Sequence, residues 1–342
     1  MAFRKSSDVR PQILEVSPEA AIPGGEFRIR GKNFAAAAWP HVRFGEVAAP
    51  LIIGSDTFLI VKVPEGAPAG EVSVGQDHQT SVSRACGIGV QIAEGLHPVA
   101  NPVIDRQGNI YSTFSGSPGQ KTPASIYKVE RNSPATPFVT DLMNATGLAL
   151  DQDDALYASS RHDGVVYRVS ADGSFAVYVE GMGVATGMAF DKENNLYVGD
   201  RSGTVFKVSP QRQIYVFATL ESSIAAYHLA FGPDGFLYVT GPTTSSFDSV
   251  HRISPAGHVE VFYRGLGRPQ GLAFDVRGSL YVAASLGGRR GVIRFTPDAK
   301  PEVFLSGPGI VGLAFSPSKS LVLATNNALY RVDIGIEGLR IP

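Results

Sequence analysis

Apolar runs and turns alternate along most of the chain in one recurring phrase. A short apolar run ends in Asp or Ser, a turn follows, and Leu-Tyr-Val or a close variant opens the next run. The second run is marked in turn by Tyr111, Tyr157, Tyr197, Tyr238, Tyr281 and Val322. These landmarks lie roughly 40–46 residues apart, a period typical of β-propeller blades. The pattern therefore predicts six blades that form one body.

Further strands of each blade can be located from the same pattern. The first strands are expected at 102–105, 147–151, 187–191, 228–232, 271–275 and 312–316. The third strands each carry one cation between apolar neighbours, namely Lys128, Arg168, Lys207, Arg252, Arg294 and Arg331. This alternation is typical of a half-buried strand whose polar residue faces outward.

The two ends of the repeat region indicate how the ring closes. The segment around 90–94 has the form of a fourth strand without a blade of its own. The last repeat, in turn, has no clear fourth strand after Val332. We expect the early segment to pair beside residues 329–332, because this pairing would close the ring and remove its exposed edges.

The first part of the chain follows a different pattern. Phe27, Ile29 and Gly31 alternate with charged residues, as expected for a strand with one buried face. Further strands are expected at 42–45, 58–63 and 70–74, with turn residues between them. Several short strands at this spacing predict a small β-sandwich at 1–87, followed by the propeller at 88–342. The predicted fold class is all-β.

Both parts resemble known families. The first resembles the IPT/TIG family of immunoglobulin-like domains, so the resemblance implies a small immunoglobulin-like sandwich. The residues that carry it are Pro11-x-Ile13, Ser17-Pro18, Gly25, Ile29-x-Gly31-x-Asn33-Phe34, Val42-x-Phe44-Gly45, Val63-Pro64 and Gly70-x-Val72-x-Val74. The repeat region resembles NHL-repeat propellers and, more loosely, six-bladed gluconolactonase-like propellers.

Composition narrows the classes of partner. The formal net charge of −1 gives no overall field for nucleic acid or membrane, and no run approaches the ~18 apolar residues of a membrane span. Cys86 is the one cysteine, so no disulfide can form within the chain. Residues 1–10 are polar and lack the apolar segment of a signal peptide. The compartment stays open, and an exported or cell-surface bacterial protein is compatible with this composition.

The gluconolactonase resemblance implies a divalent metal at one mouth of the propeller channel. Its oxygen ligands would come from the starts of the innermost strands. The corresponding residues here include no carboxylate and are Ala100, Thr146, Thr186, Tyr227, Gln270 and Val311. Asn101 and Asn144 are nearby but weak candidates. We therefore expect no metal or other cofactor, with Ca²⁺ or another divalent ion as the alternative.

Recurring aspartates precede the turns between first and second strands. Asp105, Asp151, Asp191 and Asp275 stand in acidic turns that resemble calcium loops. An aspartate also caps its own turn well, and this structural role is the interpretation that we adopt.

One set of loops has the composition of a recognition surface. Loops from fourth to first strands and from second to third strands emerge on the same face of a propeller. The candidate binding residues on this loop face are Arg161, His162, Arg201, Tyr227, His228, Arg268, Gln270 and Arg289. Arginines suit carboxylates and phosphates, because the guanidinium fork pairs with both.

Two functions are compatible with these features. The first is a non-catalytic binding protein that uses the loop face for a polar or anionic small molecule or protein segment. The alternative is a gluconolactonase-like hydrolase that acts on a sugar lactone or ester with a divalent metal in the channel. A bound metal would favour the hydrolase, since fold alone does not decide function.

Overall fold

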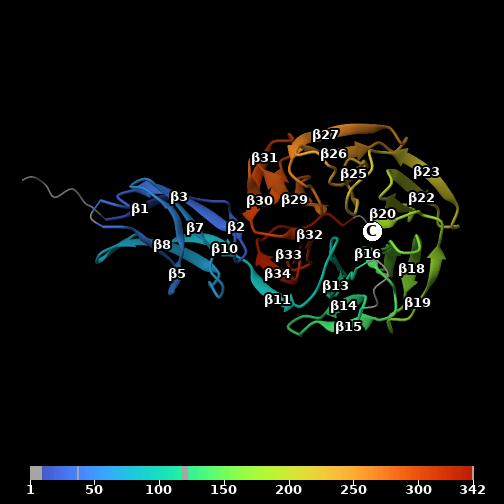
Figure 1. Cartoon of the computed structure of the whole chain (residues 1–342), viewed down its shortest axis with the longest axis horizontal. Coiled ribbons are helices and arrows are strands. Elements are labelled where there is room, and N and C mark those ends of the chain that lie inside the picture. Colours follow the sequence, from blue (N-terminus) through green and yellow to red (C-terminus); the bar gives the residue numbers. More distant parts are fainter. Residues whose placement is uncertain (1–9, 37, 118–121, 341–342) are drawn as a thin grey trace, which may run out of the picture. The chain divides into compact units, whose positions relative to one another are not determined.

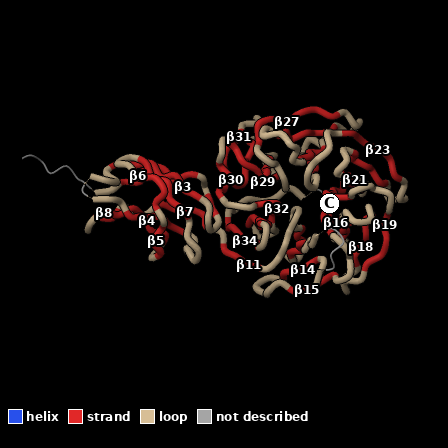
Figure 2. The backbone as a smooth tube through the Cα atoms, in the orientation of Figure 1, coloured by secondary structure: helices blue, strands red, loops and turns tan. Residues whose placement is uncertain are grey.

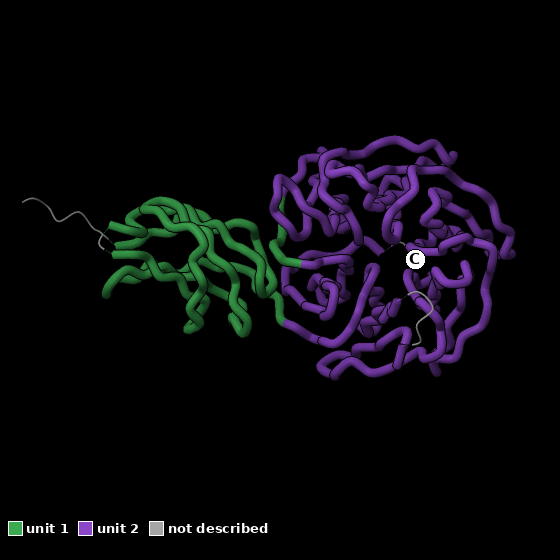
Figure 3. The backbone as a smooth tube through the Cα atoms, viewed as in Figure 1, with its two compact units in different colours: residues 1–90, 303–308 green, residues 91–302, 309–342 purple. Residues whose placement is uncertain are grey.

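The protein is built from strands, turns and loops. The computed structural model describes residues 10–36, 38–117 and 122–340, which contain no helix (Figures 1 and 2). No helix in the described part of the chain is therefore long and apolar enough to cross a membrane. The predicted all-β class is confirmed. The chain divides into two compact units, residues 1–90 with 303–308 and residues 91–302 with 309–342 (Figure 3).

The first unit contains two sheets. One has the order β1, β3, β7, β6, and the other contains β2, β10, β8, β4 and β5, with β9 paired to β8. The strands are β1 (Gln12–Ser17), β2 (Ala20–Ala21), β3 (Glu26–Lys32), β4 (His41–Phe44), β5 (Val47–Ala49), β6 (Leu51–Gly54), β7 (Phe58–Lys62), β8 (Gly70–Gln76), β9 (Gln79–Thr80) and β10 (Arg84–Ile88).

Side chains from both sheets form the core of this sandwich. In β3, Phe27 and Ile29 are fully buried while the residues between them are more exposed, as the alternation predicts. They belong to one apolar cluster with Phe44 of β4 and Leu59 of β7. The rings of Phe27 and Phe44 lie 5.7 Å apart between their centroids.

The strands from β11 onward form the six blades of a propeller over the described residues (Figure 1). Blade 1 has β12 (Val103–Ile104), β13 (Ile110–Thr113), β14 (Ile126–Val129) and β15 (Thr136–Val139); blade 2 has β16 (Ala145–Leu150), β17 (Leu156–Ser160), β18 (Val165–Val169) and β19 (Phe175–Val179); blade 3 has β20 (Ala185–Phe190), β21 (Leu196–Asp200), β22 (Thr204–Val208) and β23 (Ile214–Thr219). Each strand pairs antiparallel with the next.

The remaining blades follow the same order. Blade 4 has β24 (His228–Phe231), β25 (Leu237–Thr240), β26 (Asp248–Ile253) and β27 (Val259–Leu266); blade 5 has β28 (Leu272–Phe274), β29 (Leu280–Leu286), β30 (Arg289–Phe295) and β31 (Pro301–Ser306); blade 6 has β32 (Ile310–Phe315), β33 (Ser320–Thr325), β34 (Ala328–Asp333) and β11 (Val90–Glu94).

Blade 6 joins the two ends of the repeat region. Its outer strand β11 lies beside β34, although more than two hundred residues separate them in the sequence. Ala93 and Leu96 pack in one apolar cluster with Val322 and Leu329 of the same blade. The free edge of β34 is thereby covered by a strand from the start of the repeats.

A repeated Asp-turn-Tyr device explains the recurring sequence phrase. In blade 3, Asp191 Oδ1 accepts hydrogen bonds from the backbone N–H groups of Glu193 and Asn195, and its Oδ2 accepts one from Tyr197 Oη at 3.1 Å. Equivalent contacts hold the turns that begin at Asp105, Asp151 and Asp275. These four carboxylates therefore cap turns, as the structural interpretation predicts.

The same tyrosines join neighbouring blades. The Tyr157 ring packs edge-on against Phe190 of the next blade, with centroids 4.9 Å apart. The corresponding pairs between later blades are Tyr197–Phe231, Tyr238–Phe274 and Tyr281–Phe315. Burial, together with the neighbouring Asp151, raises the pKa of Tyr157 to about 12, so its hydroxyl remains a donor at neutral pH.

The closing strand gives the first prediction. Leu96 is 3% exposed, so Leu96→Ala should remove apolar contacts and leave a cavity, lowering the free energy of unfolding by about 2–5 kcal/mol. Val90 begins β11, which ends two residues before Leu96; it is 50% exposed, and Val90→Ala should change stability by less than about 0.5 kcal/mol. Urea titrations followed by circular dichroism measure both changes. Equal stabilities for the two variants would contradict a structural role for this segment in blade 6.

Candidate functional site

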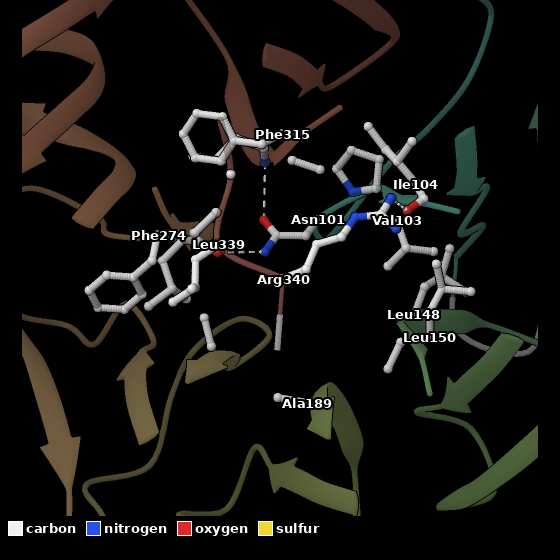
Figure 4. Close-up of a pocket in the computed structure, with 18 of the residues that line it drawn as sticks. Asn101, Val103, Ile104, Leu148, Leu150, Ala189, Phe274, Phe315, Leu339 and Arg340 are labelled. Atoms are coloured by element: carbon white, nitrogen blue, oxygen red, sulfur yellow. Dashed lines mark hydrogen bonds between the residues drawn. The ribbon is translucent and has the colours of Figure 1, made fainter. Parts of the chain in front are cut away.

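A cavity of about 580 Å³ lies along the axis of the propeller. Its wall comes from residues of all six innermost strands and from residues 337–340, which follow the last blade (Figure 4). Apolar side chains such as Leu148, Leu150, Phe274 and Phe315 make up much of the lining. Its volume lies within the range of small-molecule binding sites.

Close packing at the start of the innermost strands narrows the axis. Four blades have glycine at the same position, namely Gly147, Gly187, Gly271 and Gly312. A Cβ atom on Gly147 would lie 2.1 Å from the carbonyl oxygen of Thr186 in the next blade, and one on Gly187 would lie 2.2 Å from that of Tyr227. The two other blades carry large polar residues at this level, Asn101 in blade 1 and His228 in blade 4.

Asn101 ties three blades together. Its Nδ2 donates to Leu272 O of blade 5 at 2.9 Å, and its Oδ1 accepts from Leu313 N of blade 6 at 3.0 Å (Figure 4). Because the amide oxygen is engaged by a backbone N–H, this side chain is built as a cross-link rather than as a metal ligand. Asn144, the other weak candidate, uses its Nδ2 to bind Gly116 O and Ser117 O in blade 1.

Carboxylates, thiols and imidazoles do not gather into a metal site. Among the described residues, no group of three or more Asp, Glu, His or Cys side chains is arranged to hold a metal ion. The recurring carboxylates accept hydrogen bonds from the turns that they begin, namely those at Asp105, Asp151, Asp191 and Asp275. The residues present therefore do not fit the oxygen-rich metal centre that the gluconolactonase resemblance implies.

His228 lies inside the protein rather than on the loop face. The residue is 2% exposed, and its Nε2 is buried without a hydrogen-bond partner among the described residues. Burial lowers the pKa of His228 to about 4, so the ring is neutral at pH 7. His228 lines the axial cavity, and its contact with a ligand stays a prediction.

Tyr227 is likewise buried and is not exposed at the rim of the channel. It is 3% exposed, and its hydroxyl donates to the carbonyl oxygen of Glu221. Its backbone N–H donates to Thr186 Oγ1 at 3.1 Å, which links blades 3 and 4. Burial raises the pKa of Tyr227 to about 12. Tyr227 is buried because it packs against the preceding blade, in one apolar cluster with Tyr197 and Val205.

Arg161 and Arg201 come together on the loop face. They follow β17 and β21, the second strands of consecutive blades. Arg161 is half-buried, and its Nη2 donates to Gly116 O at 2.8 Å. Burial and the nearby charge of Arg201 both lower the pKa of Arg161. The charge of Arg201 therefore disfavours that of Arg161, and Arg201 itself is exposed.

The four remaining predicted residues differ in exposure and lie outside the axial cavity. His162 and Arg268 are exposed, and Arg268 has a left-handed backbone with φ of 49°. Gln270 and Arg289 are partly buried, and Arg289 begins β30. None of these four lines the axial cavity. The arginines on the loop face are thus separate from the axial cavity, whose lining is partly apolar and partly polar.

Sequence reasoning missed the residues after the last blade. Glu337, Gly338, Leu339 and Arg340 line the cavity, although they follow no repeat pattern. A bridge joins Gly338 to Asp275, and Leu339 N donates to Phe274 O at 2.8 Å. One feature of the sequence hints that these residues line the cavity: no fourth strand follows Val332, so they need not belong to a blade.

Comparisons with known proteins identify the fold. No family model and no curated protein matches the sequence. A gluconolactonase from Xanthomonas campestris has a similar structure, with a TM-score of 0.60 at 16% identity over 72% of this chain and 89% of that chain. An auxiliary nutrient binding protein from Bacteroides thetaiotaomicron gives 0.57 at 10% identity, over 95% and 98% of the two chains.

A third similar structure is a catalytically inactive virginiamycin B lyase from Staphylococcus aureus with quinupristin. It has a TM-score of 0.52 at 11% identity, and the match covers 95% of each chain. These likenesses define the chain as a propeller protein of the kind found in gluconolactonases, lyases and nutrient-binding proteins. At such low identity they show the fold alone.

The buried histidine gives the second prediction. Its folded pKa of about 4 lies below the ordinary value near 6.5, so the unfolded chain takes up a proton first as the pH falls. Stability contributed by the neutral ring is fully present above pH ~6.5 and should be lost by pH ~4, a decrease of about 3 kcal/mol. His228→Asn, the residue that blade 1 carries at this level, should flatten this part of the pH profile.

Urea unfolding between pH 7 and pH 4 measures the profile. His162→Asn serves as the control, because His162 is exposed, and it should keep the wild-type slope. If His228→Asn and the wild type lose the same stability over this interval, burial of a neutral His228 is contradicted.

Proposed function

We propose that this protein is a non-catalytic binding protein whose propeller holds a polar or anionic ligand on its loop face. The observation that carries the proposal is the close pair of Arg161 and Arg201. Two like charges raise each other's electrostatic energy, and an anion placed between them relieves this repulsion. Guanidinium groups also present several donors in a planar fork that matches carboxylate and phosphate oxygens.

The surroundings of the pair leave its charge uncompensated within the described residues. Arg161 donates to a backbone carbonyl, which carries no net charge. Asp200, next to Arg201 in the sequence, accepts hydrogen bonds from Val184 N and from Ser202, and forms no ion pair with either arginine among the described residues. Arg161 Nε is buried without a partner in this part of the structure. A ligand anion would supply the missing counter-charge.

The wider organisation is shared with a binding protein and with an enzyme, because the nutrient-binding protein and the virginiamycin B lyase each match 95% of this chain. We propose that residues 1–87 form an IPT/TIG immunoglobulin-like domain beside the propeller at 88–342, and that the ligand is a sugar acid, a phosphate or an acidic protein segment. His162, Arg268, Gln270 and Arg289 stay proposed contributors around the arginine pair.

The third prediction tests this site by calorimetry against a panel of sugar acids, sugar phosphates and acidic peptides. Arg201→Gln and Arg161→Gln should each weaken binding of an anionic ligand by about 1–3 kcal/mol, since each removes a charge-assisted hydrogen bond. Arg277→Gln is the matched control, because Arg277 is an exposed arginine in a turn between first and second strands on the opposite face. It should leave the affinity unchanged.

Stability and turnover complete this test. Arg201→Gln should keep the wild-type melting temperature, because an exposed loop charge adds little to stability. Binding that is insensitive to both arginine substitutions would contradict the proposed site. Hydrolysis of a sugar lactone by the purified protein with added Ca²⁺, Mg²⁺, Mn²⁺ or Zn²⁺ would overturn the non-catalytic assignment.

A further inference from the structure

The residues after the last blade complete the wall of the axial cavity. Val276 N donates to Glu337 O at 3.0 Å and Leu339 N donates to Phe274 O at 2.8 Å, so residues 337–339 run beside the end of β28. The side chain of Leu339 joins the apolar lining next to Phe274 (Figure 4). This segment is held by backbone hydrogen bonds and is therefore part of the site.

The side chain of Arg340 extends from this segment to blade 1. Its Nη2 donates to Ile104 O at 3.2 Å and to Asp105 O at 2.9 Å, both at the end of β12 in blade 1 (Figure 4). The guanidinium thus links blade 5 to blade 1 at the cavity. Two carbonyl groups satisfy part of its five donors, and they bring no negative charge.

The other cations that line the cavity are paired. Arg106 Nε lies 3.9 Å from Asp154 Oδ2, and Lys319 Nζ lies 3.2 Å from Glu337 Oε2. Within residues 10–36, 38–117 and 122–340, no carboxylate forms an ion pair with Arg340. Its side chain is exposed at the cavity, so its charge is available to a ligand.

The remaining walls suit a hydrocarbon chain. Val103, Ile104, Leu148, Leu150, Ala189, Phe274, Phe315 and Leu339 present apolar groups around the axis (Figure 4). The level of Asn101 and that of Ile104 are three residues apart along an innermost strand, which corresponds to roughly 10 Å. The cavity therefore combines an apolar chamber of this depth with one unpaired cation at its end.

We propose that the axial cavity is a second binding site, one that takes a medium-chain carboxylate. The hydrocarbon chain would lie against the innermost strands, and the carboxylate would pair with the guanidinium of Arg340. An ammonium head group would be repelled by the same cation. Arg161 and Arg201 do not line this cavity, so the site is independent of the one on the loop face.

Calorimetry with the whole chain tests the proposal, using hexanoate, octanoate and decanoate below their micelle concentrations. Each added methylene should tighten binding about fourfold while the chain still fits, which is the value for burying one CH₂ group. Octanoate should bind at least about tenfold more tightly than octanol, because a charge-assisted hydrogen bond to Arg340 is lost in the alcohol.

Two substitutions separate the head group from the cavity itself. Arg340→Gln should abolish the preference for octanoate over octanol while leaving octanol affinity unchanged, which also shows that the cavity is intact. Lys319→Gln is the matched control, since it removes a cavity cation that is already paired, and it should keep the preference. Equal affinity of the wild type for the two ligands, retention of the preference in Arg340→Gln, or no binding of any chain length would overturn the proposal.

Discussion

The close approach of neighbouring innermost strands around the axis is the constraint on which this propeller depends. At Gly147, Gly187, Gly271 and Gly312, an added Cβ atom would lie within 2.5 Å of an atom in another blade. Real Cβ atoms do not approach backbone so closely, so only glycine allows the strands to come together there. This close contact sets the radius of the ring at one level of the channel.

The properties of the channel follow from this constraint. Blade 1 has Asn101 in place of glycine at this level. Its side chain hydrogen-bonds to the backbone of blades 5 and 6. His228, at the same level in blade 4, is buried and neutral. Alanine recurs two residues after each of the four glycines, for example at Ala149 and Ala189, and leaves room for the cavity. The level of the four glycines therefore holds the ring together, while the level of the alanines leaves space for a ligand.

The sequence predicted the blades well because their determinants are local. The carboxylate of Asp191 contacts groups two, four and six residues ahead, so turn and second strand are specified within one short phrase. In blades 2 to 5, the packing of the tyrosine against the next blade then repeats with the same period. A hydrogen-bonded pattern of such short range is visible in a single sequence without any knowledge of the fold.

The site was harder to predict because it depends on contacts between distant residues. Tyr227 and Arg161 both appeared to be loop residues, but contacts with the preceding blade bury the first and leave the second half-buried. The position of Arg340 depends on Phe274 and Ile104, which are far from it in the sequence. No periodic pattern marks these relationships.

The unfolding free energy of Gly187→Ala tests the central constraint most directly. Gly187 does not have a left-handed backbone, so alanine there meets no penalty from φ, and any loss reports the contact with Tyr227 O in the next blade. The tight ring predicts a loss of about 1–3 kcal/mol or more, measured by urea denaturation. A variant as stable as the wild type would contradict close packing of the innermost strands as the basis of this fold.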